Sequence, residues 1–359
     1  MARHHWQAVR IALVSPPLLP VPPVRYGGVE RIVGVLAEGL HERGHEVTVF
    51  APGDSTAPGR LIATVPRGLW GAGFHPDPWP YYAATREAVI DASDQFDLIH
   101  NHMDQHGFEI ARRCAVPVLS TLHGRTDVDP LRGVVESNPD LALIAISESQ
   151  RSFVPSANWL ATIHHGLPLD DAPLGEGRGT HLLFVGRLSK DKGVAETVEA
   201  ARLAGRRLLV AAKALAPNEM LEFDEVIAPA VAEGIVQFIG EVDAAERDRL
   251  LGDAAATIML SRWPEPFGLV AIESLAVGTP VIAQRSGALP EIVVDGMDGF
   301  VVDGPAEAAA AADRVAELDR SAIRQRALNR FSAQRMVDEY ETTYRRALER
   351  SQGAHSATR

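Results

Sequence analysis

The stretch RWPEPFGLVAIESLAVGTP, residues 262–280, places one carboxylate directly before a predicted helix and a second inside it. These carboxylates are Glu265 and Glu273, and the apolar residues around Glu273 recur at helical spacing until a Gly-Thr-Pro sequence ends the pattern. Pro266 suits a first helical turn, where its missing N–H would have no intrahelical acceptor. The sequence therefore predicts a helix that begins near residues 267–269.

The N-terminus of this helix is a predicted anion site. The backbone N–H groups at Phe267, Gly268 and Leu269 are expected to lack intrahelical acceptors there, and the helix dipole adds positive potential. Gly268 has no side chain to obstruct a ligand. Taken alone, Glu265 fits a second interpretation, in which it only complements the dipole while Glu273 is a surface charge. The rest of the chain decides between the two.

Composition limits the classes of protein that this chain can belong to. Its 359 residues suggest two domains, and 46% hydrophobic with 23% charged residues is ordinary for a soluble protein. A net charge of −12 argues against a nucleic-acid partner. No apolar run reaches the roughly 18 residues of a membrane span, and the N-terminal apolar run is too short for a signal peptide. The single cysteine, Cys114, fits a reducing compartment, so we expect a cytoplasmic protein.

Two series of alternating strands and helices define the predicted fold class, which is α/β. The first series runs from VRIALVS (9–15) to LALIAISES (141–149), and the second from LLFVGRL (182–188) to PVIAQ (280–284). This alternation predicts two doubly wound, Rossmann-like parallel sheets, with a cleft between the domains and ligands at the carboxyl ends of the strands. The predicted parts are an N-terminal domain (1–167), a linker (168–180), a C-terminal domain (181–331), a last helix (332–350) and a frayed tail (351–359).

Basic residues follow the first strand of the second series. In FVGRLSKDKG, Arg187 and Lys192 lie just past the strand, and an arginine fork with a lysine is a common partner of a diphosphate. A solvated basic turn is the alternative. The chain has only three lysines, Lys190, Lys192 and Lys213, and all lie in this half.

The first series holds a glycine pair and several histidines. Gly27 and Gly28 follow a Pro-rich loop without the G-x-G-x-x-G pattern of dinucleotide-binding turns, so they predict either a close backbone approach to a ligand or a plain helix start. His123 ends a strand, where it can meet a ligand or be structural. His100 and His102 in IHNHMDQH would share a strand face and could form a metal pair, but no third ligand is evident.

Together these motifs resemble the family 4 retaining glycosyltransferases, which have the GT-B architecture. The resemblance covers nearly the whole chain, and its most specific element is the Glu-x7-Glu spacing of Glu265 and Glu273. The matching segments are PPVRYGGVERIVGVLAEGLHERGHEVTVFAPGDS, STLHG, AISESQR, FVGRLSKDKG, EPFGLVAIESLAVGTPVIA and GALPEIVVDGMDGF. The resemblance implies that the last helix returns to the first domain.

The resemblance also implies roles in binding a nucleotide sugar. Glu265 meets the hydroxyls of the transferred sugar, Glu273 meets the ribose, and the N–H groups at Phe267, Gly268 and Leu269 meet phosphate and sugar. Further donor-side residues are implied in the same way: Arg187 and Lys192 clamp the diphosphate, Lys213 reaches the donor, Gly27 and Gly28 close over it, and His123 meets the sugar. His102, Ser147 and Glu148 are assigned weakly to the acceptor side.

The implied reaction is a front-face transfer without a metal ion or other cofactor, in which Arg187 and Lys192 stabilise the leaving group. No side-chain nucleophile is expected, and His123, Glu265, Arg187 and Lys192 are the predicted catalytic residues. The expected donor is a UDP-sugar, with GDP-mannose next, and the acceptor carries a hydroxyl group. The loop 67–82 could stack on that acceptor through Trp70, Phe74, Trp79, Tyr81 and Tyr82, or these residues could be loop packing.

Other functions compete with this one on the same sequence. A nucleotide-sugar epimerase or a non-catalytic nucleotide-sugar-binding module would use the same architecture. A phosphorylase is disfavoured by the length of the chain, and a metal hydrolase would need more ligands than His100 and His102. The sequence leaves open the sugar, the base, the acceptor and the oligomeric state.

Overall fold

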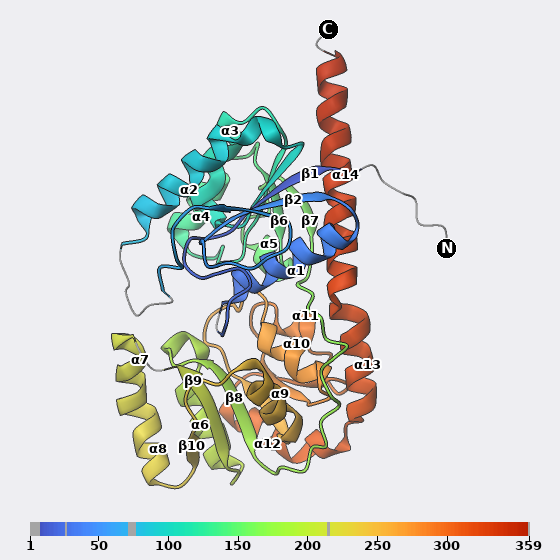
Figure 1. The fold of residues 1–359 in the computed structure, drawn as a ribbon. Coiled ribbons are helices and arrows are strands. Elements are labelled where there is room, and N and C mark those ends of the chain that lie inside the picture. The colour runs from blue at the N-terminus through green and yellow to red at the C-terminus, as the bar shows by residue number, and fades with distance from the viewer. Residues whose placement is uncertain (1–7, 26, 71–76, 214–215, 358–359) are drawn as a thin grey trace. The chain divides into compact units, whose positions relative to one another are not determined.

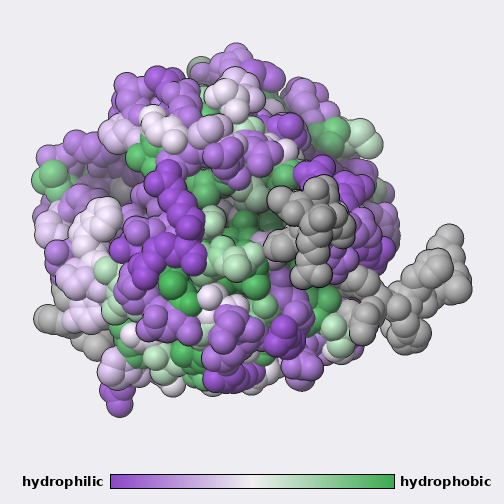
Figure 2. Space-filling model, turned by 90° about the horizontal axis from the view of Figure 1, so that it is seen from above, coloured by the Kyte–Doolittle hydropathy of each residue, from purple (hydrophilic) through white to green (hydrophobic). Residues whose placement is uncertain are grey.

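A computed structural model describes residues 8–25, 27–70, 77–213 and 216–357, with side chains through residue 353. The chain divides into two compact units. Unit 1 comprises Met1–Leu167 and Ala333–Arg359, and unit 2 comprises Pro168–Ser332. Among the described residues, no helix is both long and apolar enough to cross a membrane. Hydrophilic residues predominate on the face drawn in Figure 2, and hydrophobic residues are visible in hollows between them.

Unit 1 is built on a seven-stranded sheet in the order β3-β2-β1-β4-β5-β6-β7, and every strand pair is parallel. Its strands are β1 (Arg10–Val14), β2 (Glu46–Ala51), β3 (Arg60–Ala63), β4 (Leu98–Asn101), β5 (Val118–Thr121), β6 (Ala142–Ala145) and β7 (Trp159–Thr162). Its α-helices are α1 (Gly28–Glu42), α2 (Trp79–Asp91), α3 (Phe108–Arg113), α4 (Asp129–Glu136), α5 (Glu148–Ser152) and α14 (Ala333–Ala357) (Figure 1).

Unit 2 is built on a six-stranded parallel sheet in the order β10-β9-β8-β11-β12-β13. Its strands are β8 (Leu182–Arg187), β9 (Leu208–Lys213), β10 (Val236–Phe238), β11 (Ala256–Met259), β12 (Val281–Gln284) and β13 (Gly299–Val302). Its α-helices are α6 (Val194–Leu203), α7 (Pro217–Glu222), α8 (Ala228–Ala232), α9 (Ala244–Asp253), α10 (Leu269–Ala276), α11 (Leu289–Ile292), α12 (Pro305–Arg314) and α13 (Arg320–Phe331).

Both sheets have the apolar strands that two-sided coverage requires. All four residues of β4, β5, β11 and β13 are buried, as expected for parallel strands with helices on both faces. The strand order reverses beside β1 in unit 1 and beside β8 in unit 2. In doubly wound sheets such a reversal marks the place where loops at the carboxyl edge diverge and a ligand can bind.

The last helix completes unit 1. α14 lies beside α1 (Figure 1), and the contact is close because a Cβ on Gly39 would lie 2.6 Å from the Cγ2 of Val337. Tyr340 and Tyr344 of α14 are fully buried. The N–H of Ala333 donates to the carbonyl of Leu167 at 2.9 Å, so the start of α14 is tied to the end of the first segment of unit 1.

Three details differ from the sequence prediction. β3, β7 and β13 were not predicted; β3 and β7 mix polar with apolar residues, whereas β13 is fully buried. α14 continues past Arg350 to Ala357, since alanine and glutamine in this tail are good helix formers. The segment 168–180, predicted as a linker, runs along unit 2, where the N–H groups of Gly175, Gly177 and Gly179 donate to Val277, Gly252 and Asp253.

Candidate functional site

Two loops meet at the carboxyl edge of the unit 2 sheet. One follows β8 and forms a 3-10 turn at Lys190–Lys192, and the other follows the neighbouring strand β11. Their backbones touch, because a Cβ on Gly193 would lie 1.7 Å from the carbonyl oxygen of Leu260. The N–H of Arg262 also donates to the carbonyl of Asp191 at 2.9 Å. Gly193 therefore allows the loop after β8 and the loop after β11 to lie in direct contact.

Lys192 and Glu265 form an ion pair across these loops. The Nζ of Lys192 lies 2.9 Å from Oε1 and 2.7 Å from Oε2 of Glu265. The Nε1 of Trp263 donates to Oε2 at 3.0 Å, and the Oγ of Ser261 lies 3.3 Å from the same atom. The ammonium of Lys192 also stands 5.0 Å from the centroid of the Trp263 ring. Glu265 is only 7% exposed, so its carboxylate is oriented by several contacts at once.

A glycine also fixes the backbone of Glu265. Gly287 has φ +60°, and a Cβ there would lie 2.2 Å from the backbone nitrogen of Glu265. The N–H of Ala288 donates to the carbonyl of Glu265 at 2.8 Å, and the Oγ of Ser286 donates to the carbonyl of Trp263 at 3.2 Å. The loop after β12 thus holds the loop that carries the carboxylate.

Two further cations lie at the same edge. Arg187 and Lys213 are the last residues of β8 and β9, and they are paired in register, so their side chains project from the same face of the sheet. The Nη2 of Arg187 lies 3.5 Å from Oδ2 of Asp191, while its buried Nε has no hydrogen bond within the described residues. Lys213 forms no ion pair within the part of the chain that the structure describes.

The helix after Glu265 begins within the predicted range 267–269, but Pro266 lies outside it. α10 starts at Leu269, with Gly268 before it in a left-handed conformation (φ 110°, ψ 65°), and Pro266 precedes the helix instead of occupying its first turn. The prediction for Pro266 was wrong because the left-handed glycine, not the proline, sets the entry. The side chain of Phe267 is buried and packs edge-on against Phe331 at 6.2 Å, so only its backbone can face a ligand.

Glu273 lies inside α10 and is paired with an arginine. Its Oε1 is 2.9 Å from the Nη1 of Arg247 on α9, and the Glu273 side chain is buried. Arg247 also donates to Oδ1 of Asp248. Sequence reasoning missed Arg247, because no spacing rule connects two separate helices.

In unit 1, Gly27 and Gly28 lie where α1 begins. Gly28 is the first residue of α1 and Gly27, with φ +152°, precedes it. A Cβ on Gly27 would lie 2.8 Å from Pro23 and 3.0 Å from Leu19. The glycine is therefore required by the preceding Pro-rich loop, whether or not a ligand approaches it.

Histidines form a row at the carboxyl ends of β4 and β5. The ring of His100 is held at both nitrogens, by the hydroxyl of Tyr344 at 2.7 Å and that of Thr121 at 2.8 Å. The Nδ1 of His102 lies 2.9 Å from the Nε2 of His123. Burial lowers the pKa of His123 to about 3 and the pKa values of His100 and His102 well below their usual range. These rings are therefore neutral near pH 7.

Asp104 positions His123. Its Oδ1 accepts the backbone N–H of His123 at 2.6 Å. Asp104 has φ +49°, an unusual conformation for a residue other than glycine. Burial raises the pKa of Asp104 to about 6. The sequence offered Asp104 as part of IHNHMDQH but gave no sign of this contact.

Ser147 and Glu148, which the resemblance assigns weakly to the acceptor side, lie at the start of α5. Ser147 caps α5 by accepting the N–H of Gln150 at 3.0 Å, and Glu148 is the exposed first residue of that helix. Of the predicted aromatic loop, Trp79 and Tyr82 pack around His106, with ring centroids 4.7 and 4.4 Å away. Phe74 lies outside the described residues.

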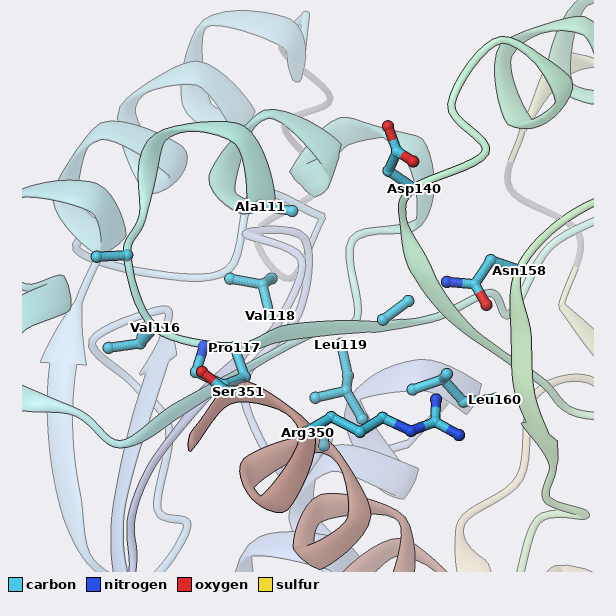
Figure 3. A pocket seen from close by; sticks show the side chains of 13 residues that line it. Ala111, Val116, Pro117, Val118, Leu119, Asp140, Asn158, Leu160, Arg350 and Ser351 are labelled. Atoms are coloured by element: carbon cyan, nitrogen blue, oxygen red, sulfur yellow. The ribbon is translucent and has the colours of Figure 1, made fainter. Parts of the chain in front are cut away.

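Unit 1 also contains several histidines near one another and a hollow at the amino-terminal ends of three strands. In the described part of the chain, no group of three or more histidine, cysteine, aspartate or glutamate residues is placed to hold a metal ion, and His100 is already held at both ring nitrogens. A hollow of about 350 Å³ lies at the amino-terminal ends of β5, β6 and β7, beside Arg350 of α14 (Figure 3). This edge of the sheet is the amino-terminal one, whereas His123 lies at the carboxyl edge.

Comparison with known proteins defines the class. Residues 172–335 match the family model of group 1 glycosyl transferases, and residues 26–172 match that of glycosyltransferase family 4. The chain belongs to glycosyltransferase family 4, the retaining glycosyltransferases of GT-B fold that transfer a sugar from a nucleotide-sugar donor. The predicted family, the two parallel-sheet units and the return of the last helix to unit 1 are confirmed.

Individual proteins that resemble this chain share less than a third of their residues with it. A D-inositol 3-phosphate glycosyltransferase of Nocardiopsis dassonvillei is 29% identical over 336 residues, covering 77% of this chain and 78% of the relative. The crystal structure of AviGT4, a glycosyltransferase involved in avilamycin A biosynthesis, has a TM-score of 0.69 at 26% identity, covering 95% of this chain and 98% of that one. Anabaena HepE in complex with UDP and glucose has a TM-score of 0.73 at 18% identity, with coverage of 94% and 99%.

Proposed function

We propose that this chain moves an α-linked hexose from a UDP-hexose to a hydroxyl group of a small-molecule or glycan acceptor, with retention and without a metal ion. The observation that carries the proposal is the contact between Lys192 and Glu265. It puts a cation for phosphate and a carboxylate for sugar hydroxyls side by side at the carboxyl edge of the sheet. In a nucleotide sugar, the diphosphate and the sugar hydroxyls also lie next to each other.

The donor-side residues of unit 2 bind different groups of the nucleotide sugar. Arg187, Lys192 and Lys213 meet the diphosphate, and Glu265 accepts hydrogen bonds from the sugar hydroxyls. The N–H groups at the start of α10 add positive potential, because the first N–H groups of a helix have no intrahelical acceptor. Glu273 meets the ribose while it stays paired with Arg247, since one carboxylate accepts several hydrogen bonds.

The chemistry needs no co-reactant. The bond between the anomeric carbon and the phosphate oxygen breaks as the acceptor oxygen bonds the same face of that carbon. The acceptor proton passes to the departing phosphate oxygen. Arg187 and Lys192 stabilise the negative charge that develops on the leaving group, and preorganised charge of this kind supplies much of the rate enhancement in many enzymes. Glu265 orients the sugar and is not the nucleophile.

For unit 1 we assign His123 to the transferred sugar and Gly27 and Gly28 to the donor. The Nδ1 of His123 has no hydrogen bond within the described part of the chain, and its low pKa keeps the ring neutral. A neutral imidazole can donate or accept with a sugar hydroxyl. The preference for UDP draws support from HepE, which was solved with UDP and glucose, and GDP-mannose is the next choice.

The test incubates the protein with UDP-glucose, UDP-N-acetylglucosamine, UDP-galactose and GDP-mannose separately, with a chelator and no acceptor. Thermal shift and release of nucleoside diphosphate are measured. We expect a UDP-sugar both to stabilise the protein and to be slowly hydrolysed. Stabilisation without hydrolysis or transfer would favour a binding module, and interconversion of two donors would favour an epimerase. No response to any donor would overturn the proposal.

A further inference from the structure

The two oxygens of the Glu265 carboxylate have unequal surroundings. Oε2 accepts the Nε1–H of Trp263 at 3.0 Å, lies 3.3 Å from the Oγ of Ser261, and is 2.7 Å from the Nζ of Lys192. Among the residues that the structure describes, Lys192 is the one partner of Oε1, at 2.9 Å. Three side chains therefore hold Oε2, whereas Oε1 depends on the lysine.

Lys192 has one hydrogen-bond donor left for a ligand. An ammonium group carries three N–H donors, and the contacts with both oxygens of Glu265 occupy two of them. A diphosphate offers several charged oxygens, and hydrogen bonds between ionised groups are the strong ones. In the proposed function, the donor therefore draws a second N–H of Lys192 toward its phosphates, and the longer contact, to Oε1, is the one that gives way. The carboxylate then needs another anchor.

Trp263 is placed to supply that anchor. Its indole N–H bonds Oε2 of Glu265, and its ring lies 5.0 Å from the Nζ of Lys192. Indole is a hydrogen-bond donor only, so it stabilises the carboxylate without competing for the protons of the ammonium. The backbone of Trp263 is held in turn, because its carbonyl accepts the Oγ–H of Ser286 at 3.2 Å. The ring can therefore keep Glu265 in place while the ammonium moves.

We propose that Trp263 is a positioning residue for the transferred sugar. With Ser261 it holds Oε2 of Glu265 while the ammonium turns to the diphosphate, so that Oε1 is the atom that accepts the sugar hydroxyls. The inference rests on the proposed function, because it assigns parts within the donor site of that reaction. It adds two residues, Trp263 and Ser261, that the donor-side assignments do not include, and it gives the two oxygens of one carboxylate different tasks.

The hexose and the nucleotide should respond differently to the loss of the Trp263 hydrogen bond. Free UDP carries the diphosphate but no hexose, so its binding does not depend on the direction of Oε1. Donor turnover does depend on it, because a sugar hydroxyl must meet this oxygen. Epimeric hexoses differ in the direction of one hydroxyl, and a carboxylate on a freer side chain discriminates between them less. A residue that only stabilised the fold would change the fraction of folded protein and leave this discrimination as it is.

The experiment uses Trp263→Phe, which removes the indole N–H and keeps an aromatic ring. UDP release is measured without acceptor for two pairs of epimeric donors, UDP-glucose with UDP-galactose and UDP-N-acetylglucosamine with UDP-N-acetylgalactosamine. Free UDP, added as an inhibitor, gives its inhibition constant. We expect kcat to fall about tenfold or more, the scale of one lost hydrogen bond to a charged group. We also expect the ratio of rates within the preferred pair to move toward unity, and the inhibition constant of UDP to stay unchanged.

Two further variants are matched to this one. Ser261→Ala removes the longer contact with Oε2, so kcat and the epimer ratio should move in the same direction by less. Trp159→Phe removes a different indole hydrogen bond, which runs to the carbonyl of Val154 in unit 1 at 2.8 Å. It should keep the wild-type kcat per folded molecule, because this indole lies outside the donor site.

The inference is overturned if folded Trp263→Phe keeps the wild-type kcat or epimer ratio, or if its inhibition by UDP weakens as much as kcat falls. It is also overturned if Trp159→Phe shows the same changes. Should Trp263→Phe fail to fold, Ser261→Ala with wild-type values would overturn it instead. Wild-type donor hydrolysis without these effects leaves the proposed function standing, whereas no hydrolysis of any of the four donors removes both.

Discussion

Lys192 reaches both carboxylate oxygens of Glu265, at 2.9 and 2.7 Å. Each residue therefore carries a partner of opposite charge before any donor arrives. Removing either one leaves the other in a largely buried position without compensation, which is costly. If the proposed function holds, this pair preorganises the donor site, because the ammonium and the carboxylate already lie side by side.

Lys192→Ala should lower turnover at least about tenfold. The loss of one preorganised donor to a developing negative charge typically removes about 3 kcal/mol of transition-state stabilisation. Steady-state donor hydrolysis measures it, with Lys190→Ala as the control, since Lys190 is an exposed lysine in the same 3-10 turn. Equal turnover in a folded Lys192→Ala would rule out the diphosphate clamp.

Gly287→Ala should disable the site, whereas Gly205→Ala should not. Both glycines have φ +60°, so both alanines bear the same backbone strain of roughly 1–2 kcal/mol. Only at Gly287 would the new Cβ collide with the backbone of Glu265, because nothing lies within 4 Å of Gly205. Donor hydrolysis and urea unfolding compare the two. Equal activity would mean that the loop relaxes without moving Glu265.

Tyr344→Phe should destabilise unit 1 by about 1–3 kcal/mol, because it leaves the buried Nδ1 of His100 without its partner. Tyr81→Phe on α2 is the control, since the hydroxyl of Tyr81 forms no hydrogen bond among the described residues. Urea unfolding followed by a probe in unit 1 measures the difference. A Tyr344→Phe variant as stable as the control would show that water replaces the hydroxyl.

Glu30→Gln should stabilise the protein increasingly as pH rises. Burial raises the pKa of Glu30 from 4.5 to about 7, so folding favours the protonated form, and that contribution is lost as pH rises through 7. The full difference corresponds to about 3 kcal/mol. Unfolding free energies at about pH 5 and about pH 8 test this, with Glu38→Gln for comparison. A difference independent of pH would contradict the burial argument.

Donor hydrolysis should be independent of divalent metal. In the proposed function, Arg187, Lys192 and the start of α10 supply the positive charge that a metal ion supplies in other enzymes. The measurement compares the rate in EDTA with the rate after Mg²⁺ or Mn²⁺ is restored. Activity that disappears in EDTA and returns with either ion would show that these groups are insufficient.

Acidification should lower the free energy of unfolding of unit 1, because His123 is kept neutral in the folded state. The pKa of His123 falls from 6.5 to about 3 on folding, so the unfolded chain binds a proton more readily. The stability that comes from keeping this ring neutral is present above about pH 6.5 and is lost as pH falls toward 3. His123→Asn should flatten this part of the pH profile of unfolding, and an unchanged profile would assign the effect to other groups.

Sequence reasoning reached the residues that follow strands, because strand ends in parallel sheets share an edge. The family resemblance and the spacing of Glu265 and Glu273 needed no coordinates. The contact between Lys192 and Glu265 could not be predicted, because it depends on Gly193 and Gly287, which let separate loops lie in contact. Arg247 beside Glu273 and Asp104 beside His123 depend in the same way on contacts between elements that no local pattern encodes.

The hydrogen bond from Ala333 to Leu167 has a consequence for how the protein is made. The chain leaves unit 1 and re-enters it at one point, so unit 2 is an uninterrupted insertion. During translation unit 2 is finished before unit 1, whose buried His100 must wait for Tyr344 in the segment that follows unit 2. A nonsense codon after Ser332 would therefore release an intact second half joined to an N-terminal half that cannot close its core.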